Sequence, residues 1–327
     1  MDLYGDLGGL YLDFADHAAG QSTCFEAWAR GVAADPDVLA WLERLPVLKR
    51  QPNLVFAAAR WHGAPAPGPY TGLRQALLGD DGRVVATILG RRTQTNEVGR
   101  LATLVPAFGV AARDSGEALA LVEVGPSAGL CLYPDRYRYR WRGPDGETVL
   151  GVGPDLPCRV DGPVPFPQDV PEVAWRAGVD LHPLSVQDQE SMDWLETLVW
   201  PEQEDRRIRL RAAIDIAAAE PPYLVRGDLL DELPALVAEA EAFGRVVVFH
   251  SAVIAYLEPA DRRRFADLMQ GLVAADVCHW VSNEAPGVLP QLTATGAAPP
   301  DRTSFVLGLD GQAVAWTHGH GSSLTWL

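Results

Sequence analysis

The residues best suited to chemistry lie together between positions 119 and 130, in the run LALVEVGPSAGL. The apolar residues at its start predict a buried strand that ends near Glu123, two residues before Gly125. Gly125 and Gly129 allow the backbone to turn sharply and a ligand to approach it closely. An acidic strand end followed by such a turn is typical of the place where a doubly wound sheet binds a nucleotide.

The spacing of the glycines in this turn indicates which kind of nucleotide could bind. The pattern is Glu-x-Gly-x-x-x-Gly, which differs from the dinucleotide fingerprint Gly-x-Gly-x-x-Gly, and no phosphate loop ending in Gly-Lys-Ser/Thr is present. A glycine turn with an acidic strand end and no pyrophosphate cradle suits adenosine without phosphates. S-adenosylmethionine is such a ligand, and it is the cofactor that we expect.

The same turn also fits a different kind of enzyme. Gly125 to Gly129 satisfy Gly-x-Ser-x-Gly, the nucleophile elbow of α/β-hydrolases, with Ser127 as the nucleophile. His250 or His318, together with an aspartate, could complete a triad in the order serine, acid, histidine. However, the residues before the turn look mostly helical, and no His-Gly-Gly run precedes the serine. A third interpretation is a strand-turn-helix that serves packing alone.

Two further acids follow later predicted strands. Asp180 ends the short strand 177–180, and Asp228 follows the strand 223–227, just before Leu229 opens a helix. In doubly wound sheets an acid at the end of the second strand hydrogen-bonds to the ribose, usually about 20 residues after the glycines. Asp180 comes later than that, which we interpret as the result of an insertion near 137–172. Because strand ends converge in a parallel sheet, we expect these acids to lie near Glu123.

His250 and Glu284 are the candidates for catalytic residues. His250 closes the apolar run VVVFH, and Glu284 closes the following strand region, so both should lie on the acceptor side of the sheet. Methyl transfer from a sulfonium requires an aligned nucleophile, a water-poor site and in some cases a base near the acceptor. These two residue types can supply such a base.

Polar residues near both ends of the chain are candidates for the substrate side of a cleft. Asn96, Glu97 and Arg100 precede a predicted helix, where helix capping is the alternative explanation of their presence. His318 and His320 lie two residues apart, on one face of an extended segment. These histidines, with Glu284 or His250, could bind a metal, but no spacing here matches a zinc signature and we expect no metal.

The chain as a whole predicts an α/β fold with two domains. Residues 1–115 predict a helical N-terminal cap, and residues 116–327 a Rossmann-like domain with a hairpin insertion near 137–172. Predicted strands at 119–124, 177–180, 223–227, 246–250 and 277–281 alternate with helices, which indicates a mostly parallel, doubly wound sheet. The segments 304–309 and 313–317 predict an antiparallel hairpin at the edge of that sheet.

Composition and charge restrict the partners. The 327 residues carry a net charge of −16, so we expect a small-molecule substrate and no nucleic acid, although arginines alternate with aromatic residues from Arg138 to Arg142. No apolar run approaches the roughly 18 residues that span a bilayer, so we expect no membrane association. Scattered cysteines and the lack of a signal peptide favour the cytoplasm.

Several runs of sequence resemble one bacterial family, DUF2332, whose uncharacterised members are similar to class I S-adenosylmethionine-dependent methyltransferases. The resemblance covers nearly the whole chain. The runs that carry it are QTNEVGR (94–100), EVGPSAGL (123–130), RAGVDLHPL (176–184), WLETLVWPE (194–202), RGDLLDELP (226–234), VVFHSAVIAYL (247–257) and HGHGSSLTWL (318–327).

The resemblance implies a fold and a set of binding residues, but no assigned reaction. Glu123, Gly125 and Gly129, with Ser127 in the turn, would form the floor under the methionine and ribose. Asp180 would accept hydrogen bonds from the ribose hydroxyls, and Asp228 with Leu229 would meet the adenine. The chain departs from the methyltransferase pattern because Pro126-Ser127-Ala128 stands where a glycine is usual. The hypotheses at this point are a small-molecule methyltransferase, a serine hydrolase and a non-catalytic binding scaffold.

Overall fold

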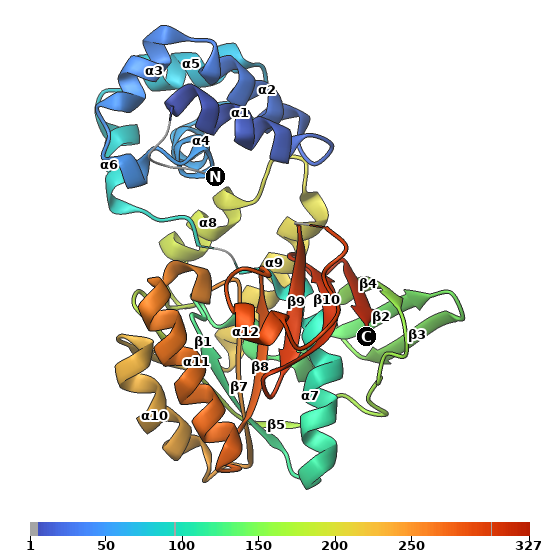
Figure 1. Ribbon diagram of the computed structural model, residues 1–327. Helices are drawn as coiled ribbons and strands as arrows, with labels where there is room; N and C mark the ends of the chain where they lie inside the picture. Colours follow the sequence, from blue (N-terminus) through green and yellow to red (C-terminus); the bar gives the residue numbers. More distant parts are fainter. Residues whose placement is uncertain (1–5, 95, 302) are drawn as a thin grey trace. The chain divides into compact units, whose positions relative to one another are not determined.

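The computed structural model describes residues 6–94, 96–301 and 303–327, and these residues form two compact units (Figure 1). The first unit contains residues up to 95 together with 188–211. The second contains residues 96–187 and 212–327. In the described ranges no helix is both long and apolar enough to cross a lipid bilayer.

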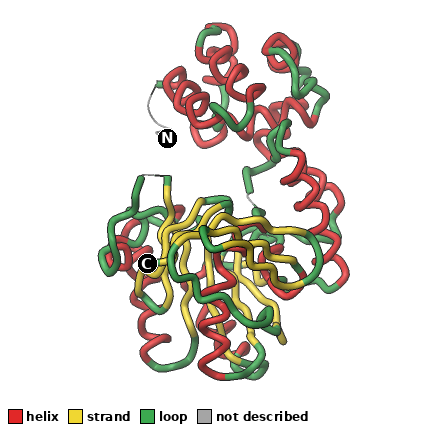
Figure 2. Tube along the Cα trace, turned by 90° about the vertical axis from the view of Figure 1, so that its right-hand side faces the viewer, coloured by secondary structure: helices red, strands yellow, loops and turns green. Residues whose placement is uncertain are grey.

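The first unit is built from helices and loops, as Figure 2 shows by colour. Aromatic side chains fill its interior, where Phe25 and Phe56 meet edge to face with ring centroids 5.1 Å apart. Asp35 caps one of its helices and is followed by Pro36 at the first helical position, as the sequence predicts. The helices are α1 (Leu7–Ala18), α2 (Thr23–Ala33), α3 (Pro36–Glu43), α4 (Pro52–Trp61), α5 (Tyr70–Leu78), α6 (Arg83–Gly90), α8 (Gln189–Leu198) and the start of α9 (Glu204–Ala219).

Partly buried polar contacts join residues 188–211 to the helices of the first unit. The Arg60 guanidinium of α4 donates to the carbonyls of Thr197 and Val199, both at 2.7 Å. The Glu202 carboxylate lies at the start of α2, where it accepts from the Ser22 hydroxyl at 2.5 Å and the Cys24 amide at 2.8 Å. An anion at a helix N-terminus satisfies amide groups that have no partner within the helix.

The second unit contains an eleven-stranded sheet in the described residues. Its order is β3-β2-β4-β11-β10-β9-β8-β7-β1-β5-β6. The strands are β1 (Leu119–Val124), β2 (Arg138–Gly143), β3 (Gly146–Gly151), β4 (Asp155–Asp161), β5 (Val173–Asp180), β6 (Tyr223–Arg226), β7 (Arg245–Ser251), β8 (His279–Glu284), β9 (Ser304–Leu309), β10 (Gln312–His318) and β11 (Ser323–Trp326).

One part of the sheet, β6-β5-β1-β7-β8, is parallel throughout. The chain begins this part at β1, adds β5 and β6 on one side, and then adds β7 and β8 on the other. The order therefore reverses beside β1. Because these strands are parallel, their carboxyl ends share one edge of the sheet, and the residues that follow them meet there.

Helices cover both faces of the parallel part. Alternate residues of β1, such as Ala120 and Val122, pack in one apolar cluster with α10 (Leu229–Ala240) and α11 (Pro259–Ala274). The opposite face packs against α7 (Leu101–Ser115), where Phe108 meets Phe249 of β7 at 5.2 Å. The short helix α12 (Pro290–Thr293) adjoins β9 and β10. Side chains alternate along a strand, so Glu123 lies on the face that α7 covers.

The predicted α/β class, the mostly parallel sheet and the antiparallel pairing of β9 with β10 are confirmed. The position of that pair at the sheet edge is wrong. β11 pairs with β10 and also with β4, so the chain continues the sheet through β2 to β3. The segment near 137–172 is thus part of the main sheet. The contacts also divide the chain after residue 95, not at the expected 115, because α7 packs on strands of the second unit.

We predict that Glu202→Gln weakens the first unit. Partial burial acts to raise the pKa of Glu202, but hydrogen bonds from Ser22, Cys24 and Thr23 outweigh it, so the pKa lies below its ordinary value. A lowered pKa stabilises the fold above pH about 4.5, and this stabilisation is lost as the pH falls. Loss of the anionic cap should cost about 0.5–2 kcal/mol at pH 7.

Urea denaturation of the whole chain at pH 7 and pH 4 measures this effect. The matched control is Glu204→Gln, two residues along, whose carboxylate pairs with Arg207 within its own helix. Equal stability of the two variants at pH 7 would contradict the prediction.

Candidate functional site

The turn after β1 has a left-handed backbone at three positions. Gly125 has φ 68°, Ser127 has φ 55° and Gly129 has φ 72°. Such values are ordinary for glycine, but they are uncommon for a residue with a side chain. Ser127 therefore needs contacts that hold it in this conformation.

Hydrogen bonds from three other segments hold Ser127. Its amide donates to Oδ2 of Asp180 at 2.9 Å, and its carbonyl accepts from the Leu184 amide at 2.9 Å. Its hydroxyl accepts from Nδ2 of Asn96 at 2.9 Å, while Oδ1 of Asn96 accepts from the Ala128 amide at 3.2 Å. Asn96 thus contacts two successive residues of the turn. We name Asn96, Ser127, Ala128 and Asp180 the turn clamp.

The turn is closed against the rest of the protein. Besides the two amides in the turn clamp, the Gly125 amide donates to the Val179 carbonyl and the Gly129 amide to the Pro126 carbonyl. A Cβ on Gly125 would lie 2.5 Å from a methyl carbon of Val253. A Cβ on Gly129 would lie 2.8 Å from the Pro222 ring. The turn therefore offers no row of free amides to a phosphate.

Glu123 is the unusual residue of the site. Its side chain is only 8% exposed, and Oε2 makes no hydrogen bond to any described residue. Burial raises the pKa of Glu123 well above its ordinary value; Arg100 opposes this shift and Asp180 adds to it. A buried polar atom without a partner costs free energy, and native structures leave few of them.

Arg100 is near Glu123 but is bonded elsewhere. Its Nε donates to the Gly319 carbonyl at 2.8 Å, and another guanidinium nitrogen donates to the Ser251 carbonyl at 2.9 Å. The neighbouring Glu97 accepts from the Gly99 amide at 3.1 Å. Arg100 therefore joins β7 to the turn that precedes β11, and its positive charge is held close to Glu123.

The other acids at the strand ends differ in their freedom to bind a ligand. Asp180 accepts from the amides of Ser127 and His182, one bond to each carboxylate oxygen. Each oxygen retains a second site for a donor. Asp228 caps α10 through the Leu230 amide at 2.8 Å and is exposed, and Leu229 is half-buried against the apolar cluster.

His250 and Glu284 form a buried pair with each other. The distance from Nδ1 of His250 to Oε1 of Glu284 is 2.8 Å, and Nε2 of His250 accepts from the indole of Trp280 at 3.1 Å. The same carboxylate oxygen accepts from the amides of Val253 and Ile254. His250 is fully buried and packs on Phe265 of α11, so both ring nitrogens have partners within the protein. This geometry favours a structural role over the predicted catalytic one.

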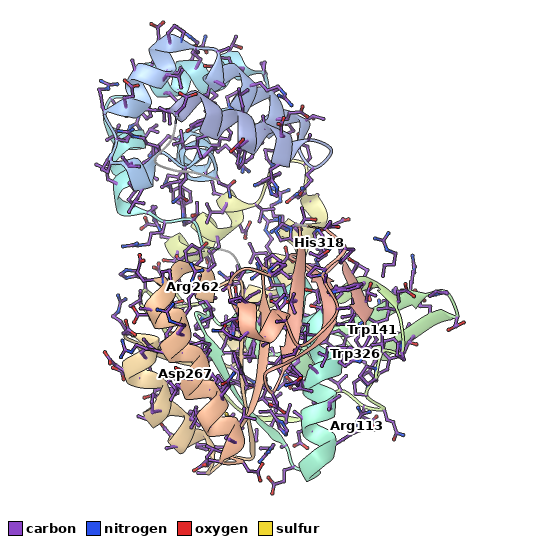
Figure 3. All side chains as sticks on the ribbon, viewed as in Figure 1. Arg113, Trp141, Arg262, Asp267, His318 and Trp326 are labelled. Carbon is purple, nitrogen blue, oxygen red and sulfur yellow. The ribbon has the colours of Figure 1, made fainter. Side chains whose placement is uncertain are left out.

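His318, which Figure 3 labels, is the last residue of β10, and His320 lies in the turn between β10 and β11. The His320 amide donates to Nδ1 of His318 at 3.1 Å, and their ring centroids are 5.6 Å apart. Within the described parts of the chain, no three histidine, cysteine or acidic side chains gather as metal ligands would.

The structure thus brings some predicted residues together and separates others. Asn96, Ser127 and Asp180 meet in the turn clamp, and Arg100 and Asp180 both influence the pKa of Glu123. His250 lies on the opposite face of the sheet, beneath α11.

Cys131 is a site neighbour that the sequence analysis missed. Its side chain is buried, and its pKa is raised by burial and then by the nearby Glu123. A single cysteine just after a turn carries no pattern from which this proximity could be inferred.

We predict that Glu123→Gln stabilises the protein as the pH rises. In the unfolded chain Glu123 ionises near its ordinary pKa of 4.5, whereas the folded chain keeps its proton to higher pH. The folded state then binds more protons, so its stability falls as the pH rises above about 4.5. Glutamine cannot ionise, so the variant avoids this loss of stability. Each unit by which the pKa of the folded state exceeds that of the unfolded state corresponds to about 1.4 kcal/mol of stability.

Denaturant unfolding of the wild type and the variant between pH 4.5 and 8 measures this difference, which should grow with pH. Asp267→Asn on α11, an exposed acid, is the matched control and should show no such trend (Figure 3). A Glu123→Gln variant that loses stability at pH 8 would show that the carboxylate is paired in the folded state.

We also predict that Gly125→Ala is more damaging than Gly116→Ala. Both glycines are left-handed, with φ 68° and 69°, so each substitution costs about 1–2 kcal/mol of backbone strain. At Gly125 the new methyl group also meets Val253, whereas at Gly116 no atom of the described residues, apart from the adjoining chain, lies within 4 Å. Overpacking should add about 1–3 kcal/mol, measurable by thermal or urea denaturation. Equal losses would mean that Val253 moves aside.

The fold and the site define an α/β protein with a large, mostly parallel sheet and acidic residues at the ends of adjacent strands. The family model described as "Uncharacterized protein conserved in bacteria (DUF2332)" matches residues 9–326, and the chain belongs to this family. This confirms the resemblance found in the sequence. Comparisons with curated proteins and with solved structures found no match.

Proposed function

We propose that the second unit binds S-adenosylmethionine and catalyses methyl transfer to a small molecule. The parallel strands β6-β5-β1-β7-β8 correspond to the order 3-2-1-4-5 when numbered along the chain. That order is typical of Rossmann-like, doubly wound sheets, which bind ligands at the carboxyl edge where the strand order reverses. Here the reversal lies beside β1, the strand that ends in Glu123 and the closed turn.

The observation that carries the proposal is the unpartnered Oε2 of Glu123. The turn clamp satisfies the polar groups around it, but this buried oxygen has no donor within the described residues. A ligand ammonium or hydroxyl group would complete it, and a hydrogen bond to a charged group contributes about 1.5–3 kcal/mol. The amino group of S-adenosylmethionine is such a donor.

The closed turn favours S-adenosylmethionine over a dinucleotide as the ligand. Pyrophosphate binding needs free backbone amides at a glycine turn, and the amides of the turn are already bonded within the protein. The site offers carboxylates in their place, which suit a ligand with ammonium, sulfonium and hydroxyl groups.

In this proposal the acids have separate tasks. Glu123 accepts from the amino group, Asp180 accepts from ribose hydroxyls through its remaining lone pairs, and Asp228 with Leu229 borders the adenine. The cofactor, when bound, supplies an electrophilic methyl group. The protein must orient the acceptor and keep out water, and no step requires His250 or Glu284 as a base.

A serine hydrolase is the second candidate, because Ser127 has the left-handed backbone of a nucleophile elbow. Against it, the Ser127 hydroxyl accepts from Asn96 and contacts no histidine among the described residues, and a 3₁₀ turn at Leu130–Leu132 follows where an α-helix is usual. Labelling by a fluorophosphonate that disappears in Ser127→Ala would support the hydrolase and oppose the methyltransferase.

We predict that the whole chain binds S-adenosylhomocysteine or S-adenosylmethionine in isothermal titration calorimetry. Glu123→Gln should weaken binding roughly 10- to 100-fold, because it loses one charge-assisted hydrogen bond. Since burial raises the pKa of Glu123, binding of an ammonium group should also release a proton. Titrations in two buffers of different ionisation enthalpy detect that release.

Asp267→Asn is the matched control and should bind like the wild type. Absence of binding by the wild type at millimolar ligand would contradict the cofactor proposal and leave a non-catalytic scaffold as the leading interpretation. Binding that is unchanged in Glu123→Gln would show that the carboxylate is not the ligand's partner.

A further inference from the structure

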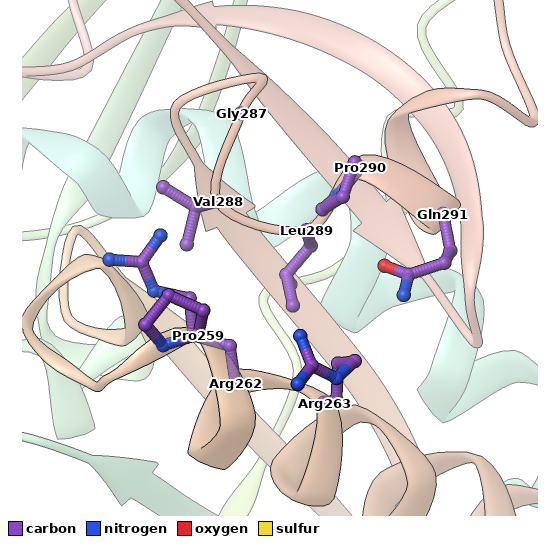
Figure 4. A pocket seen from close by; sticks show the side chains of 8 residues that line it. All are labelled: Pro259, Arg262, Arg263, Gly287, Val288, Leu289, Pro290 and Gln291. Carbon is purple, nitrogen blue, oxygen red and sulfur yellow. The ribbon is translucent and has the colours of Figure 1, made fainter.

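A second candidate site lies at the carboxyl edge of the sheet, between the start of α11 and the loop that follows β8. It is a pocket of about 130 Å³ (Figure 4). The first turn of α11 forms one wall, and the loop leading into α12 forms the other. The lining residues are Pro259, Arg262, Arg263, Gly287, Val288, Leu289, Pro290 and Gln291.

Arg262 is held in place by the loop that precedes α11. Its Nε donates to the Leu257 carbonyl at 2.8 Å, and a second nitrogen donates to the Ala255 carbonyl at 2.6 Å. A guanidinium has five N–H groups, so three remain for another acceptor. The charge is therefore fixed at the pocket wall, and no acidic side chain of the described residues pairs with it.

Arg263 differs from the next arginine in the chain. Arg264 pairs with Asp261 at 2.9 Å, one turn earlier on α11. Arg263 lines the pocket and has no hydrogen bond or ion pair with any described residue. The pocket thus receives two positive charges, while the nearest acid on the same helix turn is already paired.

The opposite wall is largely apolar. Val288 and Leu289 are 7% and 4% exposed and belong to the apolar cluster beneath the sheet, and Pro290 follows them. We propose that this pocket binds a small organic carboxylate, with its charged group on Arg262 and Arg263 and its carbon chain against Val288 and Leu289. Planar guanidinium groups match the geometry of a carboxylate, and the apolar wall favours an attached carbon chain over an inorganic anion.

Contacts connect the pocket with the turn after β1. Glu284, at the end of β8, accepts from the amides of Val253 and Ile254 and thereby fixes the loop that binds Arg262. Val253 in that loop packs against Gly125. The next assignment rests on the proposed methyltransferase function. In that function the pocket would hold the carboxylate end of the methyl acceptor.

Titration of the whole chain with butanoate, followed by NMR chemical shifts, tests the site without any cofactor. We expect saturable millimolar binding, with shift changes at residues 259–263 and 287–291. Butanamide, which has the same shape without the charge, should not saturate. Arg263→Gln should weaken binding roughly tenfold or more, as expected for a lost charge-assisted contact.

Arg264→Gln is the matched control, since this neighbour is exposed, already paired and outside the pocket lining. The proposal is overturned by no saturation with butanoate, by equal binding of butanamide, or by equal losses in the two arginine variants. Tighter binding of inorganic phosphate than of butanoate would instead identify a simple anion site and would also refute it. None of these outcomes depends on S-adenosylmethionine, so failure of the carboxylate site and failure of the cofactor proposal are distinguishable.

Discussion

The structure around the candidate site depends on the hydrogen bonds that hold Ser127 in a left-handed conformation. Asp180 reaches it from the neighbouring strand and Asn96 from the segment before α7, so two parts of the chain far apart in sequence fix one turn. Replacing either side chain by alanine would remove hydrogen bonds that hold the turn. The same bonds occupy the amides of the turn, which are the groups that a phosphate would need.

Side-chain alternation along the strands imposes the second constraint. Glu123 points toward α7, whereas His250 points toward α11 and packs on Phe265. Sequence position alone places both near strand ends, Glu123 as a cofactor-binding residue and His250 as a catalytic candidate on the acceptor side. Once the sheet is assembled they lie on opposite faces, and His250 is satisfied by Trp280 and Glu284. Glu284 in turn accepts from the amides of Val253 and Ile254 in the loop after β7.

The sequence predicted local features better than distant ones. Apolar runs located β1 and β7 closely, because a buried parallel strand must be apolar on both faces. The sequence also placed acids at the ends of β1 and β5.

The sequence prediction failed where the outcome depends on which strands pair. β11 joins β10 to β4, and no local pattern states that a C-terminal segment will do so. The place of residues 188–211 in the first unit likewise depends on Arg60 and Glu202 contacting distant backbone groups. The closed state of the turn could not be anticipated either, since it requires the positions of Asn96, Val253 and Pro222 at once.

The proposed function depends on the contrast between Glu123 and its surroundings. A protein under selection only for stability gains by pairing or removing a buried carboxylate, since an unpartnered one costs free energy at neutral pH. Here the adjacent backbone amides of the turn all have hydrogen-bond partners. The nearby cation, Arg100, donates to two carbonyls instead of to Glu123. If Glu123 had a purely structural role, Arg100 would be expected to form an ion pair with its carboxylate. Arg100 only partly opposes the rise in the pKa of Glu123 that burial causes, and Oε2 has no donor among the described residues. On the proposed function, the missing donor for this oxygen is the amino group of the ligand.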